Sequence, residues 1–468
     1  MLKTPEDGEW WSLMNALGRR HRSARAGSAT VVHVSPEQSF RSEDNKLRWN
    51  DRPVHDWYRF VLSFPPHLVG EYLERFGLRP GHTVLDPFCG TGTTLVECKK
   101  QGIRSVGIEC NPMAHFATQV KVDWSVDPEK LLRHARRIAK KALETMSHEG
   151  LEESLPLFGH CGAPELPLRT LPEEASKLLL RNSISPLPLH RTLVLLETLR
   201  THEDSDVGRH ERLALAKAIV FGISNLSFGP EVGVGRPKQD APVVDLWLSN
   251  VEKMAADLAV VRANADVKSD VFCEDSRRLG GVLPEASVDA VITSPPYPNE
   301  KDYTRTTRLE SVLLGFVESK EDLRSVKRRL VRSNTRGVYK GDADDLLVAG
   351  HEEIERVASA IESRRIDLSK TSGFERLYAR VARLYFGGMA RHLAELRAVL
   401  RPGAQLAYVV GDQASYLQVM IRTGQILADL ARSLGYEVVG MDLFRTRLAT
   451  ATRKQLREEV LVLRWLGE

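Results

Sequence analysis

Residues 83–94 read Thr-Val-Leu-Asp-Pro-Phe-Cys-Gly-Thr-Gly-Thr-Thr, and this stretch decides the fold. A short apolar run ends in an acid, a Gly-x-Gly turn follows, and a helical pattern opens at Thr93. A parallel strand passes into a helix in this way around a bound nucleotide-like ligand. Gly90 and Gly92 lack a Cβ, so they can turn tightly and let a ligand approach the backbone. The stretch therefore predicts an α/β fold with a ligand at this turn.

A second junction between a strand and a loop lies far downstream, at residues 287–297. It reads Ser-Val-Asp-Ala-Val-Ile-Thr-Ser-Pro-Pro-Tyr. The apolar run is typical of a buried strand, and it stops at two prolines, which cannot continue a ladder of hydrogen bonds. Open α/β sheets bind ligands at the carboxyl ends of their strands. We therefore expect the rigid loop at residues 294–297 to carry the chemistry.

The two junctions together resemble the amino-group DNA methyltransferases, which use S-adenosylmethionine to methylate cytosine N4 or adenine N6. The resemblance rests on Asp86-Pro87-Phe88-Cys89-Gly90-Thr91-Gly92-Thr93 and on Thr293-Ser294-Pro295-Pro296-Tyr297. It covers residues 48–124 and the chain from residue 266 onward. The resemblance implies a Rossmann-like class I methyltransferase fold, with a mostly parallel seven-stranded sheet, a C-terminal antiparallel hairpin and, in this chain, helical insertions.

The resemblance places S-adenosylmethionine along the first half of the sheet. Phe64 and Pro65 would close over its methionine end, although a plain packing helix also explains this segment. Glu109 ends the next predicted strand, about 20 residues past the glycine turn, where a carboxylate accepts hydrogen bonds from ribose hydroxyls. The resemblance implies that Asp275 accepts from the adenine amino group. The expected cofactor-binding residues are Phe64, Pro65, Asp86, Pro87, Phe88, Gly90, Gly92, Thr93, Glu109 and Asp275.

The resemblance assigns catalysis to Ser294, Pro295, Pro296 and Tyr297. In this interpretation the Ser294 hydroxyl and the Pro295 carbonyl accept hydrogen bonds from the target amine, which points its lone pair at the methyl group. Tyr297 stacks on the base, which has to leave the duplex to be reached. Serine rather than aspartate before Pro-Pro-Tyr favours cytosine N4. Adenine N6 stays open, because a hydroxyl and a carboxylate both accept from an amine.

Two further functions stay open. An RNA base-amine methyltransferase would keep both motifs, although it would usually bring a recognisable RNA-binding module. A non-catalytic DNA-binding regulator of the same fold would be expected to lose Ser294 or the glycines, and this chain keeps them. The expected partner is double-stranded DNA, and a cognate restriction or defence system is a candidate partner. The recognition sequence and the oligomeric state are left open.

The chain of 468 residues is long enough for a catalytic domain with additional material. Apolar residues at helical spacing predict a mostly helical insertion between the second and third strands of the sheet, which could recognise DNA, mediate dimerisation or buttress the sheet. The expected parts are an N-terminal arm (1–47), the first half of the catalytic domain (48–125), the helical insertion (126–265), the Ser-Pro-Pro-Tyr part (266–303), a second insertion (304–386) and the C-terminal strands (387–468).

A basic run in the second insertion is the strongest candidate for DNA contact. Charge runs are usually solvated faces, but this one closely follows the catalytic loop and includes Ser333, Asn334 and Thr335. Side chains of these types contact phosphates and base edges. The predicted DNA-binding residues are Arg324, Lys327, Arg328, Arg329, Arg332 and Arg336.

Composition permits this function without demanding it. The hydrophobic fraction of 42% and the charged fraction of 27% are typical of a soluble globular protein, and a net charge of +4 permits nucleic-acid binding. Five scattered cysteines with no Cys-x-x-Cys pair indicate neither a zinc site nor disulfides, and we expect no metal. An acidic N-terminus and no run of about 18 apolar residues predict a cytoplasmic protein without a membrane segment.

Overall fold

The computed structural model describes residues 47–59, 63–151, 167–228, 231–448 and 455–467. The predicted N-terminal arm therefore lies outside the described residues, apart from Leu47. Within these ranges no helix combines the length and the apolar character that crossing a membrane requires.

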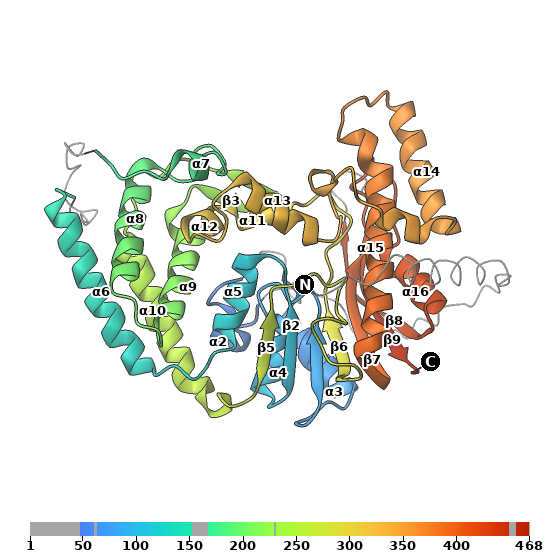
Figure 1. Cartoon of the computed structure of the whole chain (residues 1–468), viewed down its shortest axis with the longest axis horizontal. Helices are drawn as coiled ribbons and strands as arrows, with labels where there is room; N and C mark the ends of the chain where they lie inside the picture. The colour runs from blue at the N-terminus through green and yellow to red at the C-terminus, as the bar shows by residue number, and fades with distance from the viewer. Residues whose placement is uncertain (1–46, 60–62, 152–166, 229–230, 449–454, 468) are drawn as a thin grey trace, which may run out of the picture.

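One mixed sheet of seven strands organises the molecule (Figure 1). Its spatial order is β5-β2-β1-β6-β7-β9-β8. The strands are β1 (Thr83–Asp86), β2 (Arg104–Ile108), β5 (Ser269–Phe272), β6 (Val288–Thr293), β7 (Leu400–Gly411), β8 (Tyr436–Leu448) and β9 (Gln455–Trp465). The pairs from β5 to β7 are parallel, whereas β9 runs antiparallel to both β7 and β8. The predicted fold class, with an antiparallel hairpin at the C-terminal edge, is confirmed.

The sheet reverses its order at β1, which lies between β2 and β6. Such a switch point leaves a crevice outside the carboxyl ends of the central strands, because the connections leave in opposite directions. The glycine turn follows β1 and the Ser-Pro-Pro-Tyr loop follows β6, so both predicted motifs end up at this crevice. The helices packed along this part of the sheet are α3 (Pro66–Arg75), α4 (Thr93–Lys100) and α5 (Pro112–Lys121).

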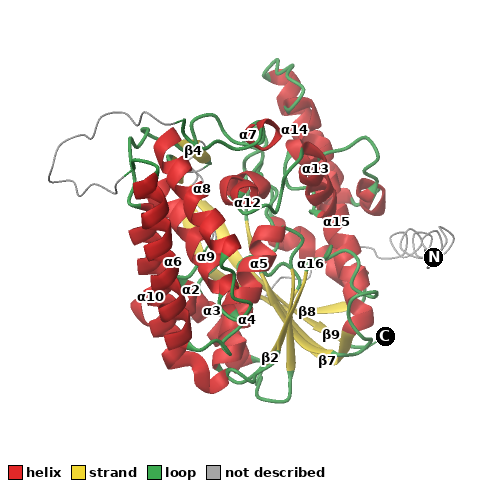
Figure 2. Ribbon diagram, turned by 60° about the vertical axis from the view of Figure 1, so that its left-hand side comes forward, coloured by secondary structure: helices red, strands yellow, loops and turns green. Residues whose placement is uncertain are grey.

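The first insertion is mostly helical and lies between β2 and β5. It forms a block beside the β5 edge, as Figures 1 and 2 both show. Its long helices pack around a continuous apolar cluster that includes the fully buried Ile138, Leu213 and Trp247. Its elements are α6 (Pro128–His148), α7 (Glu173–Ser176), α8 (Pro186–Thr201), α9 (Gly208–Ala218), η2 (Ile219–Ile223), β3 (Leu226–Phe228), β4 (Val232–Val234), α10 (Val243–Val261) and η3 (Arg262–Asn264).

The segment before α3 ties this block to the catalytic domain. It contains the short elements η1 (Trp49–Asp51) and α2 (Arg52–His55). The Asp257 carboxylate on α10 accepts hydrogen bonds from the Val54 amide at 2.9 Å and from the Trp57 indole at 2.8 Å. Because both donors belong to buried residues, these bonds hold the first insertion firmly against the sheet.

The second insertion follows the Ser-Pro-Pro-Tyr loop and lies above the carboxyl ends of the strands (Figure 1). Its elements are α11 (Tyr303–Thr306), α12 (Arg308–Leu313), α13 (Lys320–Arg329), η4 (Thr335–Gly337), η5 (Asp344–Val348), α14 (Glu352–Asp367) and η6 (Glu375–Leu377). The sheet then resumes through α15 (Tyr378–Val399), and α16 (Thr423–Ser433) lies between β7 and β8.

The expected end of the second insertion, at residue 386, does not coincide with the end of a helix or strand. That position falls inside α15, which continues without a break from Tyr378 to Val399. The helix is buried along most of its length, and a Cβ on Gly387 would lie only 1.8 Å from the Asp344 carbonyl oxygen. Glycine therefore lets η5 press directly onto α15, and the insertion and the catalytic domain share this helix.

Candidate active site

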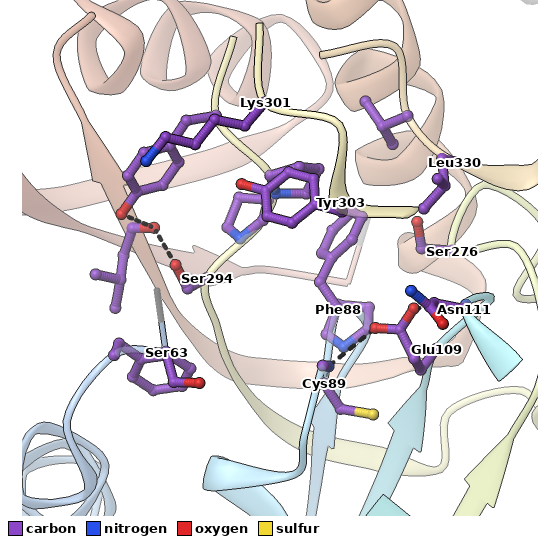
Figure 3. Close-up of a pocket in the computed structure, with 18 of the residues that line it drawn as sticks. Ser63, Phe88, Cys89, Glu109, Asn111, Ser276, Ser294, Lys301, Tyr303 and Leu330 are labelled. Atoms are coloured by element: carbon purple, nitrogen blue, oxygen red, sulfur yellow. Dashed lines mark hydrogen bonds between the residues drawn. The ribbon is translucent and has the colours of Figure 1, made fainter. Parts of the chain in front are cut away.

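A cavity of about 440 Å³ opens at the carboxyl ends of the central strands. Both predicted motifs line it, although they are far apart in the sequence. Figure 3 shows Phe88 and Cys89 from the glycine turn on one side and Ser294 from the other junction facing the same space. The predicted residues that line the cavity are Phe64, Pro87, Phe88, Gly90, Thr93, Glu109, Ser294, Pro295, Pro296 and Tyr297.

Glu109 is the anionic group at the floor of the cavity (Figure 3). Its Oε2 accepts a hydrogen bond from the Gly90 amide at 3.0 Å, and its Oε1 accepts from the Asn111 amide at 2.7 Å. Burial raises the pKa of the Glu109 carboxyl to about 7, although these amides partly oppose the shift. Each oxygen keeps a further lone pair for a ligand hydroxyl. This donor and acceptor chemistry fits the ribose of S-adenosylmethionine.

Gly92 is absent from the cavity lining, whereas Gly90 lines it. Gly92 is the N-cap of α4 with a left-handed φ of 81°. A Cβ at this position would lie 2.8 Å from Thr118 Cγ2. The glycine is therefore needed for the turn and for the packing of α4 against α5. Pro65, the N-cap of α3, also lies outside the cavity lining.

Asp86 lies beneath the cavity instead of lining it. Its side chain is fully buried, and its Oδ1 accepts from Thr293 Oγ1 at 2.6 Å and from the Phe88 amide at 3.1 Å. Burial raises the pKa of this carboxyl to about 6. The bond to Thr293 joins the end of β1 to the end of β6, so Asp86 holds the two halves of the site in register.

Asp275 is also absent from the cavity lining. Both of its carboxylate oxygens accept hydrogen bonds from Arg277, Oδ1 from Nε at 2.9 Å and Oδ2 from Nη2 at 2.7 Å. The same guanidinium reaches Asp344 Oδ2 at 2.6 Å. A carboxylate held in this way directs its acceptors at Arg277, which does not favour the expected contact with the adenine amino group. The neighbouring Glu274 and Ser276 line the cavity in its place.

The Ser-Pro-Pro-Tyr loop faces the cavity from the end of β6. The Ser294 hydroxyl donates to the Val409 carbonyl at 3.2 Å, and the Tyr297 hydroxyl lies 3.5 Å from the same carbonyl (Figure 3). A Cβ on Gly411 would lie 3.1 Å from the Tyr297 ring, so glycine at the end of β7 makes room for that ring. Burial, and next the Glu458 carboxylate, raise the pKa of Tyr297, which keeps its hydroxyl neutral.

The basic run of the second insertion divides into three groups. Arg324, Arg328 and Arg336 are exposed. Arg332 is only 5% exposed and is paired through two hydrogen bonds with Asp342, which does not favour its predicted contact with DNA. Burial in an ion pair makes it a structural residue.

The other two basic residues of the run are turned inward. Lys327 pairs with Asp302 at 2.8 Å, and neither side chain is exposed. Arg329 lines the cavity and donates to the carbonyl oxygens of Cys273 at 3.0 Å and Cys110 at 3.4 Å. A residue predicted to touch DNA therefore lies at the end of the cavity near Glu109 and Ser276.

Several residues that line the cavity belong to neither of the two sequence motifs. Lys301 and Tyr303 follow the Ser-Pro-Pro-Tyr loop closely, and their position alone could have identified them. The others stand on or beside the C-terminal strands, and no motif marks them. They are Gln413, Ser415, Phe444, Arg445, Arg447 and Glu458.

The strand order, the glycine turn and the carboxylate at the end of β2 define a class I S-adenosylmethionine-dependent methyltransferase. Residues 26–119 match the model of the N6_N4_Mtase family, described as DNA methylase. Over these residues the chain is similar to the N6/N4 family of amino-group DNA methyltransferases.

Two curated relatives align with most of the chain. Type II methyltransferase M.BsoBI from Geobacillus stearothermophilus is 26% identical over 444 residues, which cover 86% of this chain and 82% of the relative. Type II methyltransferase M.AvaI from Nostoc sp. is 24% identical over 445 residues, which cover 88% of this chain and 86% of the relative.

Among solved structures, a SAM-dependent methyltransferase from Methanosarcina mazei aligns with a TM-score of 0.29 and 10% identity, over 85% of this chain and 98% of that one. So loose a superposition carries no argument about this protein.

Proposed function

We propose that this protein is the methyltransferase of a type II restriction–modification system and that it methylates N4 of a cytosine flipped out of double-stranded DNA. The observation that carries the proposal is that Ser294 and Glu109 line one cavity from two remote segments of the chain. The two long alignments to proteins named type II methyltransferases support the biological setting. Methylation of adenine N6 is the alternative.

The cavity lining supports a defined orientation for S-adenosylmethionine. Glu109 would accept hydrogen bonds from the ribose hydroxyls, and Phe64 and Phe88 would cover the methionine end. Because Asp275 is held by Arg277, we assign the adenine end to Ser276, which lines the cavity. When bound, the cofactor supplies a methyl group activated by a positively charged sulfur.

The remaining task of the protein is to aim a weak nucleophile. The Ser294 hydroxyl donates its proton to the Val409 carbonyl, so its lone pairs remain free to accept from the target amine. The Pro295 carbonyl would supply a second acceptor, and together the two acceptors fix the direction of the amine lone pair. Stacking on Tyr297 would offset part of the unstacking cost of about a few kcal/mol.

The choice of cytosine as the target rests on the motif and not on the charge of the acceptor. The amine of cytosine and that of adenine both need acceptors, and neither base requires a carboxylate for this purpose. Serine in place of aspartate before Pro-Pro-Tyr is the sequence difference that favours N4.

Expression in a host without DNA methylation tests the proposal. Single-molecule sequencing and nucleoside mass spectrometry should report N4-methylcytosine within one short motif. Ser294→Ala should lower kcat by about 100-fold or more, while calorimetry should show unchanged affinity for S-adenosylmethionine. The matched control is Ser147→Ala, at an exposed serine of α6, which should behave as the wild type.

Two outcomes contradict parts of the proposal. Full activity of Ser294→Ala would remove the assignment of the catalytic loop. If the wild-type protein produced N6-methyladenine, the target base would be adenine instead of cytosine, and the assignment of the site would be unchanged.

A further inference from the structure

The cavity extends beyond Ser294 and Tyr297 to an end that carries three cationic side chains, Lys301, Arg445 and Arg447. Two of them are already paired. Arg445 Nε donates to Glu458 Oε2 at 2.5 Å, and Arg447 Nε lies 3.4 Å from Glu458 Oε1. The charge of Glu458 is therefore shared by two guanidinium groups.

Lys301 differs from both arginines. Among the described residues, its ammonium group makes no hydrogen bond and no ion pair. Its main chain is nevertheless fixed, because its amide donates to Asn299 Oδ1 at 3.2 Å and its carbonyl accepts from Asn334 Nδ2 at 3.1 Å. Figure 3 shows the side chain reaching into the cavity on the side where Ser294 lies. The main chain of Lys301 is thus held in place, while its ammonium group has no acceptor among the described residues.

The surroundings make an unused donor costly. Lys301 is half-buried, and its burial, and next the charge of Arg447, lower the pKa of the ammonium group. Glu231 and Glu458 oppose this shift from nearby. A polar group withdrawn from water without a partner costs free energy, and a ligand acceptor recovers it. The position therefore favours a ligand that brings an acceptor to this end of the cavity.

At the second position from its amine, cytosine brings such an acceptor, whereas adenine does not. Along the edge of cytosine, the exocyclic amine is followed by the ring nitrogen N3 and then by the carbonyl oxygen at C2. Along the matching edge of adenine, the amine is followed by N1 and then by a C–H group. A donor placed two positions from the amine therefore has a partner only when the base is cytosine.

We propose that Lys301 donates a hydrogen bond to the C2 carbonyl oxygen of the flipped cytosine while Ser294 holds its amine. The inference rests on the proposed N4 activity and adds a specificity-determining residue to it. With adenine in the cavity, the ammonium group would stay unpaired. Discrimination that depends on an unpaired buried group is strong, because the wrong substrate leaves that cost uncompensated.

Two variants and an altered substrate test this assignment. Lys301→Met keeps most of the apolar stem and removes the donor, whereas Lys301→Gln keeps a neutral donor. The substrates are duplexes with the sequenced motif, carrying at the target position either cytosine or a 2-aminopyridine C-nucleoside. This analogue keeps the amine and the adjacent ring nitrogen but lacks the carbonyl. The control variant is Lys140→Met, on the exposed face of α6.

The expected results form a double-mutant cycle. On cytosine, Lys301→Met should lower kcat/KM about 100-fold, and Lys301→Gln should lose less. The wild type should lose a similar factor on the analogue, and Lys301→Met should lose little more there, because the interaction is already absent. Affinity for S-adenosylmethionine should be unchanged in every variant, and Lys140→Met should match the wild type throughout.

Four outcomes would overturn the assignment. Wild-type activity on the analogue equal to that on cytosine would do so without any variant, even if Lys301→Met failed to fold. If the loss from Lys301→Met and the loss from the analogue multiplied, Lys301 would not contact the C2 carbonyl oxygen. If Lys301→Met reduced the salt dependence of DNA binding by about one phosphate contact, the partner of Lys301 would be the DNA backbone. A parallel loss of cofactor affinity would mark a structural role. Failure of the proposed N4 activity is recognised separately, from the base that the wild type methylates.

Discussion

At the scale of single residues, the site is built from carboxylates that burial holds close to neutrality. Burial raises the pKa of Glu109 to about 7 and that of Asp86 to about 6, although both accept hydrogen bonds. Desolvation thus outweighs two amide donors at Glu109. The hydrogen bond from Thr293 to Asp86 joins β6 to β1, whereas Glu109 lines the cavity and keeps lone pairs for a ligand.

The protonation state of Glu109 should control cofactor binding. A raised carboxyl pKa means that the anion is present above about pH 7 and is lost as the pH falls through that value. If the anion accepts from ribose, wild-type affinity for S-adenosylmethionine should be about tenfold weaker at pH 6 than at pH 8. Glu109→Gln should bind about 10 to 100 times more weakly at pH 8, without this pH dependence.

Isothermal titration calorimetry at pH 6, 7 and 8 provides the measurement. Glu285→Gln, at an exposed loop position, is the control and should keep the wild-type profile. A flat profile for the wild type, or an unchanged slope in Glu109→Gln, would show that another group governs binding.

At the scale of elements, the basic side chains of α13 point in two directions, some towards solvent and one into the cavity. The helix begins with a capping box in which the Ser319 hydroxyl accepts from the Asp322 amide and the Asp322 carboxylate accepts from the Ser319 amide. Arg324 and Arg328 point outward and only approach Glu321 at 3.4 Å, whereas Arg329 turns into the cavity. One helix thereby links the surface that we expect to meet DNA to the end of the cofactor cavity.

Replacing Arg324, Arg328 and Arg336 together by alanine should weaken DNA binding through lost phosphate contacts. The dissociation constant for duplex DNA should rise, and the slope of log K against log salt should shrink by up to about 3, since each phosphate contact contributes about 0.9. At saturating DNA, kcat should stay close to that of the wild type. Fluorescence anisotropy at several salt concentrations provides the measurement.

The matched control removes three exposed cations, Arg133, Arg136 and Lys140, from the outer face of α6. If both triple variants reduced the slope equally, the effect would come from net charge and not from the surface of α13.

At the scale of the whole molecule, buried polar contacts join segments that are remote in the sequence. The Tyr58 hydroxyl, before α3, donates to Glu310 on α12 in the second insertion, and both residues are buried. Burial raises the pKa of Glu310 to about 7, so the folded protein retains a proton that the unfolded chain gives up near pH 4.5. The contribution of Glu310 to stability is therefore present below that range and is lost as the pH rises towards 7.

Glu310→Gln should remove the loss of stability that the wild type shows as the pH rises towards 7. The amide oxygen of glutamine still accepts from Tyr58 but cannot ionise, so the variant should match the wild type at pH 5. At pH 8.5 it should be more stable, by on the order of 2 to 3 kcal/mol. Urea midpoints at both pH values give the answer, with Glu129→Gln on the exposed face of α6 as the control. A variant that is less stable at pH 8.5 would contradict the sign of this effect.

Much of the site was predictable because its chemistry is local. Glu109 and Ser294 each stand directly after a strand and Gly90 lies in the turn that follows one, and strand ends are visible in hydrophobic patterning. The pairing of Asp275 and Arg332 could not be predicted, for a shared reason. Each has an opposite charge close by in space, Arg277 for Asp275 and Asp342 for Arg332, and sequence does not report which charges pair. The continuity of α15 across residue 386 is likewise a result of packing, because this helix contacts both parts of the molecule.

The sequence by itself predicted the two strand ends that carry the motifs, since apolar periodicity, glycines and prolines act over a few residues. Its resemblance to a known family implied the seven-stranded sheet and the antiparallel edge. Only the tertiary structure decided which side chains meet at the cavity. Lys301, Arg445 and Glu458 come together there from separate strands and loops. Whether a charged side chain forms an ion pair with a neighbour or remains available to a ligand depends on the distance between the two groups and on their burial. Both are set only when the whole chain has packed.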